Sequence, residues 1–215
     1  MNILIIIPSY NDSIHLPELI QKIRLNTDKN ILIIDDGSQV PILLNENNVD
    51  IVRNKVNLGK GAALKVGFKY AAKNGFSHAI TMDSDLQHAP SKLNSFIEFD
   101  ENSDLVYGRR MIDKKMPIHR RLSNELTSSI LSMLCGKKIY DSQCGYRRYS
   151  IQSVLNLECK ENGFQFESEI LIKLSRRSAN IGHVIIPTIY GDELSSIQNV
   201  TDTVKFIKLI LGNLW

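Results

Sequence analysis

The sequence is poor in cysteine and in long apolar runs. Its three cysteines, at 135, 144 and 159, are an odd number and lack metal-site spacing. They predict reduced thiols rather than a disulfide framework or a zinc centre. No stretch approaches the roughly 20 apolar residues of a membrane span. The apolar run 3–7 has no basic flank and meets Pro8 too early for a signal peptide, so a cytoplasmic location is expected.

Excess charge of one sign is also missing. The 26 Lys and Arg against 23 Asp and Glu leave a net charge of +3, too small to indicate nucleic acid as a partner. The sequence has no internal repeat, no low-complexity tract and no linker rich in Pro, Gly or Ser. With 215 residues, 43% of them apolar, the chain is expected to fold as one domain over 1–215 with a sizeable core.

Apolar runs that end in polar turns alternate with helical patterns in the first half. Strands are expected at 2–7, 31–34, 49–53, 78–82 and 104–107, and helices after the capping residues 11–13 up to about 25, over 59–74 and over 90–99. This alternation predicts βαβ units, hence an α/β fold with a mostly parallel sheet flanked by helices. Residues 1–108 are interpreted as the nucleotide-binding half.

The second half is more basic. Helices are expected over 121–134 and 166–178, with strands near 144–149 and over 184–190. Residues 109–200 are interpreted as an acceptor-binding half. The last stretch, 201–215, is an amphipathic segment.

The most informative stretch is 78–90, where an apolar run ends in Asp83-Ser84-Asp85 and then Gln87. Open α/β sheets bind ligands at the carboxyl ends of their strands. Two carboxylates there suit Mg²⁺ or Mn²⁺ that holds the phosphates of a nucleotide. An alternative interpretation is a polar turn that caps the next helix. Polar turns also follow the first and second strands, which predicts that all three meet in one crevice.

Five motifs together resemble the family 2 glycosyltransferases of the GT-A fold. They are Ile7-Pro8-Ser9-Tyr10-Asn11-Asp12, Ile34-Asp35-Asp36-Gly37-Ser38, Asn57-Leu58-Gly59-Lys60-Gly61-Ala62-Ala63, Met82-Asp83-Ser84-Asp85-Leu86-Gln87-His88 and Asp141-Ser142-Gln143-Cys144-Gly145-Tyr146-Arg147. Within that family the sequence is most similar to the dolichyl- or polyprenyl-phosphate mannosyl- and glucosyltransferases. The resemblance implies an inverting transfer of a hexose from a nucleoside diphosphate sugar, of the GDP-mannose or UDP-glucose type, with Mg²⁺ or Mn²⁺.

The resemblance also implies roles for the residues that match the motifs. Metal ligands would be Asp83, Asp85 and Gln87, with the ribose as an alternative partner for Asp83. Residues assigned to the nucleotide sugar are Pro8, Tyr10, Asp12, Asp36, Lys60, Gly61, Asp83 and Arg109. Two positions depart from the pattern: Asp12 stands where relatives usually carry Glu, and Ala89 replaces a common proline.

The expected acceptor is a polyprenyl phosphate, which is already anionic and needs positive charge to hold it. Arginines suit that task through paired contacts with phosphate. The candidates are Arg109, Arg120, Arg121, Arg147 and Arg148, of which Arg120 and Arg147 are placed in the catalytic set with Asp141. Asp141 is the first candidate for a base or orienting group, before Glu167 and Glu169. A glycan hydroxyl is the alternative acceptor, and it would require a base.

The segment 201–215 offers a way to reach a lipid acceptor. At helical spacing Val204, Ile207, Leu211 and Leu214 share a face, and Phe206, Leu209 and Trp215 widen it. Such a helix could lie at the inner face of the cytoplasmic membrane. The alternative is a helix packed on its own domain or on a second subunit of a homo-oligomer.

Three other functions are alternatives to glycosyl transfer. A nucleotidyltransferase usually has a glycine-rich basic loop after its first strand, where this chain has Pro8-Ser9-Tyr10. A dinucleotide-dependent dehydrogenase has a motif of three glycines directly after its first strand. Gly59 and Gly61 lack the third glycine and do not follow the first strand. A non-catalytic nucleotide-sugar-binding module is the alternative from a different class, and the intact Asp83, Asp85 and Gln87 argue against it.

Overall fold

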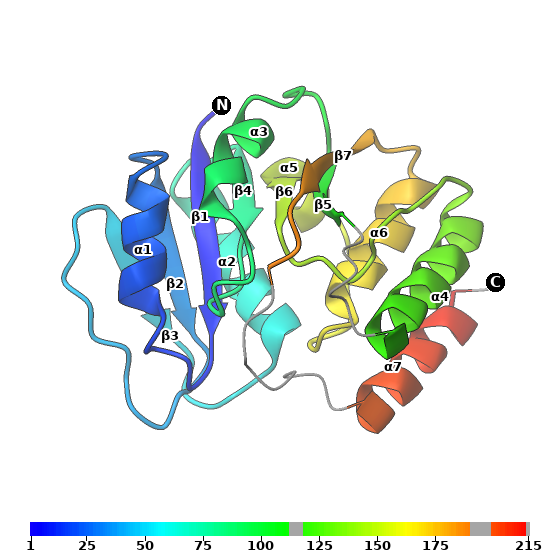
Figure 1. Ribbon diagram of the computed structural model, residues 1–215, viewed down its shortest axis with the longest axis horizontal. Helices are drawn as coiled ribbons and strands as arrows, with labels where there is room; N and C mark the ends of the chain where they lie inside the picture. The colour runs from blue at the N-terminus through cyan, green and yellow to red at the C-terminus, as the bar shows by residue number, and fades with distance from the viewer. Residues whose placement is uncertain (112–117, 190–198, 214–215) are drawn as a thin grey trace.

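A computed structural model describes residues 1–111, 118–189 and 199–213, and the side chains of His119, Arg120, Asn199 and Val200 are outside that description. One seven-stranded sheet with the order β3-β2-β1-β4-β6-β5-β7 forms the centre, and helices cover both of its faces (Figure 1). The strands are β1 Ile3–Ser9, β2 Asn30–Asp35, β3 Val49–Arg53, β4 His78–Thr81, β5 Leu105–Arg110, β6 Arg147–Ser150 and β7 Ile181–Ile186. The helices are α1 Leu16–Arg24, α2 Lys60–Lys73, the short 3₁₀ helix η1 Pro90–Lys92, α3 Leu93–Ile97, α4 Ile118–Cys135, α5 Ile151–Leu155, α6 Phe166–Arg176 and α7 Asn199–Leu211.

The sheet is parallel except for β6. Strands β1, β2, β3 and β4 pair in parallel, as do β5 and β7, whereas β6 runs antiparallel to β4 and β5. Because of this reversal, the first residue of β6, Arg147, lies opposite Thr81 near the end of β4 and Tyr107 on β5. The segment that precedes β6 therefore arrives at the carboxyl ends of the parallel strands. We call this side the carboxyl edge and the opposite side the amino edge.

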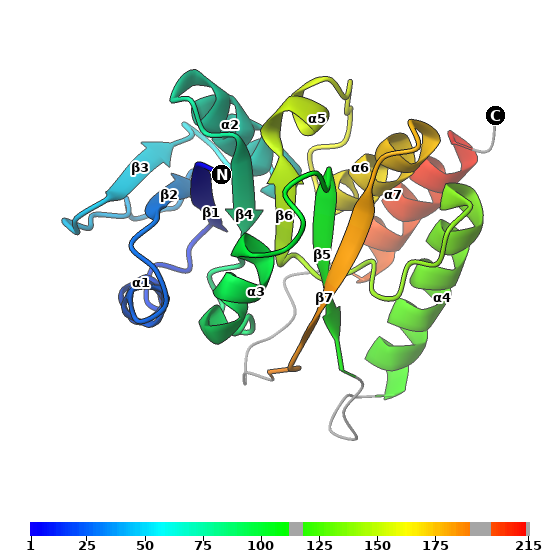
Figure 2. The ribbon, with the colours of Figure 1, turned by 90° about the horizontal axis from the view of Figure 1, so that it is seen from above.

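Alternating side chains of the strands build two cores, one on each face of the sheet. On β1, Ile3, Ile5 and Ile7 pack with α1 and α3, while Leu4 and Ile6 pack with α2 and the helices of the second half. Figure 2 shows α1 and α3 on one face and α2, α5, α6, α4 and α7 on the other. All five residues of this run are fully buried, as expected of a central parallel strand.

Most expected elements are present, and four differ. The helix after β1 begins at Leu16 rather than directly after residues 11–13, because Asn11 adopts a φ of +53° and His15 is the N-cap residue. The expected helix over 90–99 is a 3₁₀ turn followed by α3. The last strand comes early, at Ile181–Ile186, and α5 was not expected. The described residues include no helix with the length and apolarity to cross a membrane.

Early pairing of β7 has a packing reason. Gly182 lies opposite Val106, and a Cβ at that position would come within 2.5 Å of the Phe99 ring. Only glycine lets β7 approach the segment that precedes β5. Tyr190, which belonged to the expected strand, lies outside the described residues.

Candidate functional site

Three turns meet at the carboxyl edge, each following a parallel strand. The Ser84 hydroxyl donates to the Asp12 carboxylate at 2.5 Å, which joins the turn after β4 to the turn after β1. The backbone N–H of Asn11 donates to Ser38 Oγ at 2.9 Å, and Asn11 Oδ1 accepts from the N–H of Gln39. The expected convergence of the three turns is confirmed. Tyr10 stands at this edge with 46% of its surface exposed, and Pro8 is half-buried.

Two aspartates at the carboxyl end of β2, Asp35 and Asp36, accept hydrogen bonds from neighbouring loops. Asp36 accepts the backbone N–H groups of Leu58 and Gly59, the latter at 2.8 Å, and a bond of 2.7 Å from Asn54. It thereby ties the end of β2 to the loop that enters α2. Burial favours the neutral acid of Asp35, but hydrogen bonds from Ser38 and the charge of Arg53 lower its pKa.

Lys60, the first residue of α2, reaches the carboxylates of two other elements. Its Nζ lies 2.6 Å from Oδ1 of Asp83 and 3.3 Å from Oε2 of Glu167 on α6. Burial alone would lower the pKa of Lys60, but these carboxylates raise it. Burial would raise the pKa of Asp83, but Lys60 lowers that pKa to about 2. Both groups are therefore charged at neutral pH.

Two glycines allow this arrangement. A Cβ on Gly145 would lie 2.6 Å from Lys60 Nζ and 2.7 Å from Oδ2 of Asp83, so the segment before β6 packs directly on the ion pair. A Cβ on Gly61 would meet Cβ of Phe166 at 2.5 Å, and the N–H of Ala62 donates to the carbonyl of Asn162. The loop before α6 therefore covers the first turn of α2, and Gly61 serves this contact.

The turn after Asp83 is tight. Asp85 Oδ1 accepts the N–H of Gln87 at 3.0 Å, and Leu86 between them has a φ of +58°, an uncommon conformation for this residue type. His88 is buried, accepts the N–H of Asp83 through Nδ1 and stacks on Tyr146. Burial lowers the pKa of His88 to about 4. This histidine therefore packs against Tyr146 and caps the turn.

A divalent cation fits the donor set of this turn. Asp83, Asp85 and Gln87 offer hard oxygen atoms, and all three are only partly buried. Within the described ranges no group of three or more His, Cys, Asp or Glu could by itself hold a metal ion. Mg²⁺-type sites commonly use one or two carboxylates and leave the remaining positions to substrate phosphates and water. The residues present match that open type of site.

Asp141 is fully buried and engaged by Arg110 of β5. Arg110 Nε donates to Oδ2 at 2.8 Å, and its Nη2 donates to Oδ1 at 3.0 Å. The pair holds the Arg110 side chain at the end of β5, and the carboxylate raises the pKa of this arginine although burial opposes it. Of the two expected roles for Asp141, base or orienting group, these contacts favour the second. The sequence reasoning did not single out Arg110, whose signal was its position beside Arg109 at a strand end.

Two arginines were assigned wrongly to the acceptor. Arg147 is 0% exposed, and its guanidinium donates to the carbonyl groups of Cys144, Glu167 and Ser142. Arg148 is equally buried on the other face and donates to the carbonyls of Phe96 and Phe99. Neither can contact an anionic acceptor, because both guanidinium groups lie inside the protein and bind its backbone.

The other basic candidates lie nearer the surface. The Arg109 guanidinium lies 4.0 Å from the centre of the Tyr140 ring, and Arg121 pairs with Glu125 on exposed α4 at 2.9 Å. Arg120 belongs to α4, but its side chain lies outside the described part of the chain. The two buried glutamates of α6 differ: Glu167 faces Lys60, whereas Glu169 accepts the N–H groups of Lys160 and Glu161.

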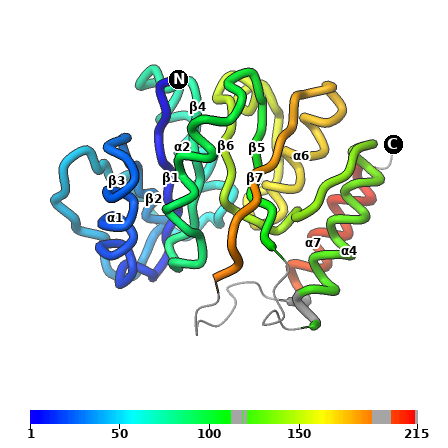
Figure 3. The backbone as a smooth tube through the Cα atoms, turned by 45° about the horizontal axis from the view of Figure 1, so that its top comes forward, coloured from blue at the N-terminus to red at the C-terminus, as the bar shows by residue number. Residues whose placement is uncertain are grey.

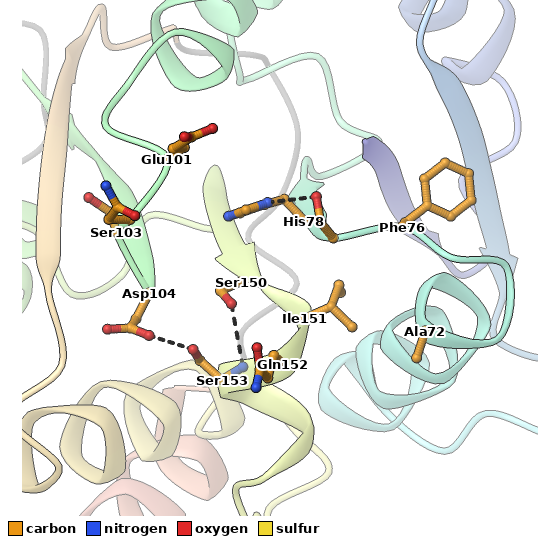
Figure 4. A pocket seen from close by; sticks show the side chains of 12 residues that line it. Ala72, Phe76, His78, Glu101, Ser103, Asp104, Ser150, Ile151, Gln152 and Ser153 are labelled. Carbon is orange, nitrogen blue, oxygen red and sulfur yellow. Dashed lines mark hydrogen bonds between the residues drawn. The ribbon is translucent and has the colours of Figure 1, made fainter. Parts of the chain in front are cut away.

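A pocket of about 530 Å³ opens at the amino edge, away from all these groups. Its lining comes from α2, the start of β4, the segment before β5 and the turn from β6 into α5 (Figure 4). His78 there contacts Ser77, and Ser153 donates to Asp104. Its lining carries two acidic residues, Glu101 and Asp104, among mostly neutral side chains, and so differs from the paired charges of the carboxyl edge.

Comparison with known proteins gives consistent results. The model of the family "Glycosyl transferase family 2" matches residues 4–155. The UDP-N-acetylglucosamine–dolichyl-phosphate N-acetylglucosaminyltransferase of Methanococcus voltae is 30% identical, and the alignment covers 88% of this chain and 86% of that protein. The polyprenol monophosphomannose synthase of Mycolicibacterium smegmatis is 26% identical, with 85% and 74% covered.

Solved structures show the same fold. Glucosyl-3-phosphoglycerate synthase from Mycobacterium tuberculosis, in a crystal structure with Mn²⁺, uridine diphosphate and glucosyl-3-phosphoglycerate, superimposes with a TM-score of 0.75 at 18% identity. The match covers 99% of this chain and 79% of that one. The expected α/β architecture of the GT-A type is confirmed.

Proposed function

The chain belongs to glycosyl transferase family 2, and we propose that it transfers a hexose, with inversion and with Mg²⁺ or Mn²⁺, from a nucleoside diphosphate sugar to a polyprenyl phosphate. The observation that carries this proposal is the meeting of Asp12, Lys60 and the Asp83–Gln87 turn at one edge of the sheet. The relatives from Methanococcus voltae and Mycolicibacterium smegmatis are named for dolichyl phosphate and polyprenol phosphate, which supports the choice of acceptor class.

Residues 1–108 would bind the donor. Tyr10 has an exposed ring at the carboxyl edge and can lie against the base, with Pro8, Asp12 and Asp36 around the nucleoside. Lys60 would place its ammonium near the ribose or the diphosphate. The donor proposed for this edge is of the GDP-mannose or UDP-glucose type. The UDP in the structurally similar mycobacterial synthase supports the UDP choice by analogy of fold.

Asp83, Asp85 and Gln87 would hold the cation. When bound, a divalent cation supplies positive charge that stabilises the departing nucleoside diphosphate. The protein's own contribution is to fix these oxygens at the end of a buried strand, so that they are oriented before the donor arrives.

Residues 109–200 would bind the acceptor. A phosphate acceptor is already an anion and needs no base, whereas a hydroxyl acceptor needs one. The buried Asp141 carboxylate accepts hydrogen bonds from Arg110 through both oxygens, so we assign it to fixing the Arg110 side chain. We assign Arg110 and Arg109, with Arg120 and Arg121 on α4, to the anionic acceptor.

An exposed apolar face supports contact with a lipid surface. Helices α4 and α7 lie side by side in all three backbone views (Figure 3). Both helices carry exposed apolar side chains, which we together call the α4–α7 face: Ile118, Leu122, Leu126, Met133, Val204, Ile207 and Leu211. Lys205 and Lys208 are also exposed and lie on α7, where their ammonium groups would suit anionic lipid headgroups.

The other face of α7 packs on the protein. Leu209 is buried, and Phe206 and Ile210 pack against the core cluster behind the sheet. Phe206 and Leu209 therefore do not widen the exposed surface as the helical spacing had suggested. Leu214 and Trp215 lie outside the described residues.

The transfer itself is tested by incubating the protein with labelled GDP-mannose, UDP-glucose or UDP-N-acetylglucosamine and a polyprenyl phosphate. We expect label in a lipid-soluble product with one donor, only when Mn²⁺ or Mg²⁺ is present. Transfer only to a glycan hydroxyl would contradict the acceptor. Nucleotide binding without any turnover would instead indicate a binding module.

The lipid contact is tested by flotation with anionic vesicles. Replacing Leu122, Leu126 and Ile207 with Ser removes apolar side chains from the α4–α7 face and should weaken vesicle binding by about tenfold. Leu43, which is 87% exposed on a loop elsewhere, provides the control substitution Leu43→Ser. Equal flotation of both variants, or none by the wild type, would contradict the contact and favour a second subunit as occupant.

A further inference from the structure

Lys60 lies in a row of alternating buried charges. Oε1 of Glu167 lies 3.9 Å from Nε of Arg147, Oε2 of Glu167 lies 3.3 Å from Nζ of Lys60, and this Nζ lies 2.6 Å from Oδ1 of Asp83. The side chains of Arg147, Glu167 and Lys60 are 0%, 7% and 13% exposed. Only Asp83, at 30%, is open to solvent. The row therefore leads from the interior to the oxygens that face the donor site.

The exposed end of this row is where the proposed function places a divalent cation. A cation that approaches Asp83 repels the ammonium that already lies on Oδ1. If the buried ammonium loses one carboxylate partner, it needs a second one, because an unpaired charge inside a protein is strongly disfavoured. Glu167 is the second carboxylate within reach of Lys60.

Glu167 is held in place for this task. Its own carbonyl accepts a bond of 2.9 Å from Nη1 of Arg147, which fixes the first turn of α6. Oε1 of Glu167 is buried and makes no hydrogen bond with the described residues, so it is available as a further acceptor for the Lys60 ammonium. On the other side Gly145 lies against the ion pair and limits where the ammonium can move.

We infer that Glu167 is a positioning residue: it retains the Lys60 ammonium in the donor site while Asp83 exchanges that ammonium for a divalent cation. The inference rests on the proposed function for the cation site and adds a residue to it. Glu167 does not touch the donor or the cation. It acts through Lys60, and its effect is on the affinity of the cation.

The matched control is the neighbouring buried glutamate of the same helix. Glu169 is as buried as Glu167, but it bonds the backbone of Lys160 and Glu161 and the ammonium of Lys173, away from the site. Glu167→Gln and Glu169→Gln remove the same charge from the same helix. A general effect of neutralising a buried carboxylate would therefore affect both variants.

The test measures Mn²⁺ binding by electron paramagnetic resonance in the presence of UDP and, separately, GDP, with thermal unfolding to verify the fold. We expect Glu167→Gln to weaken Mn²⁺ binding by about tenfold, or about 1.4 kcal/mol, because Lys60 then has Asp83 as its single carboxylate partner. Glu169→Gln should stay within about twofold of the wild type. Glu167→Asp, which keeps the charge, should recover part of the loss.

A second substitution separates this role from a structural one. In a Lys60→Met background no ammonium competes for Asp83, so adding Glu167→Gln should leave Mn²⁺ affinity unchanged within about twofold. A folded Glu167→Gln variant with wild-type Mn²⁺ affinity would overturn the inference, and so would an equal loss in the Met background. If the wild type binds no Mn²⁺ with either nucleotide, the cation site itself fails, and the inference fails with it.

Discussion

At the carboxyl edge of the sheet, Lys60 lies between Asp83 and Glu167, and Arg110 lies on Asp141, all within 3.3 Å. At the amino edge the same sheet has a pocket of about 530 Å³ with mostly neutral polar side chains. The carboxyl edge carries several paired charged side chains, whereas the pocket at the amino edge is lined mainly by neutral ones. Both edges belong to the same strands.

The direction of the strands explains the difference. The loops that leave β1, β2 and β4 meet at one edge, and antiparallel β6 brings the segment with Asp141 and Gly145 to the same place. At the other edge, side chains such as Asp104 and Arg148 bond nearby backbone and close the ends of the strands. In this structure the convergence of strand ends gathers the charged side chains of the proposed site, whereas the pocket at the amino edge lies apart from them.

The largest expected effect separates the two edges directly. Asp85→Ala removes a carboxylate from the proposed cation site and should weaken Mn²⁺-dependent binding of UDP or GDP by about 100-fold, with the fold intact. Glu101→Gln removes an exposed carboxylate that lines the pocket at the amino edge and should change binding less than about twofold. Calorimetric titration with and without Mn²⁺ measures both. An equal loss of nucleotide binding in both variants would contradict a cation site confined to the carboxyl edge.

A smaller effect is expected from added bulk at the carboxyl edge. The methyl group of Gly145→Ala would meet Lys60 and Asp83 at under 3 Å, which should reduce nucleotide affinity by about tenfold. Gly75, with a φ of +74° and open space around its Cβ position, offers the control. Gly75→Ala should cost about 1 kcal/mol in unfolding free energy and leave affinity unchanged. If Gly145→Ala leaves nucleotide affinity unchanged, the Lys60–Asp83 ion pair can shift away from the added methyl group without affecting binding.

The smallest effect concerns the amino edge. Burial and the charge of Arg148 lower the pKa of His78, so the unfolded chain takes up a proton at this residue more readily than the folded protein. Stability should therefore fall as the pH drops below about 6.5, and His78→Gln should reduce that fall. Urea unfolding of both proteins between about pH 7 and pH 5 measures the difference, in which contributions from other histidines cancel. An identical pH dependence of the two proteins would contradict a neutral buried His78.

Much of the fold was predictable from local signals. The strand expected at 2–7 is present as β1 and is buried, and the helix expected over 59–74 is present as α2, which ends just before Gly75 with its positive φ. Errors came where neighbours decide the boundary. Strand β7 begins at Ile181 because its partner β5 and the Phe99 ring set its position, which no local pattern reveals.

The candidate site divides in the same way. Asp83, Asp85 and Lys60 could be singled out because carboxylates at a strand end and a Gly-Lys-Gly turn are visible in the sequence. Arg147 was misplaced because a basic residue in a motif looks the same whether it faces solvent or three backbone carbonyls. The pairing of Arg110 with Asp141 and that of Glu167 with Lys60 could not be foreseen, since each pair joins residues more than 30 positions apart.

The sequence by itself determined the class of fold, the family and the polar turns that follow the strands, because these depend on short apolar runs and on motifs of a few residues. Tertiary structure alone decided the partners of each charge. Those partners depend on antiparallel β6 and on α6, which bring Gly145 and Glu167 from the second half of the chain against Lys60 and Asp83 of the first. A charged side chain acts through its nearest counter-ion, and that neighbour is set by packing between elements that are far apart along the chain.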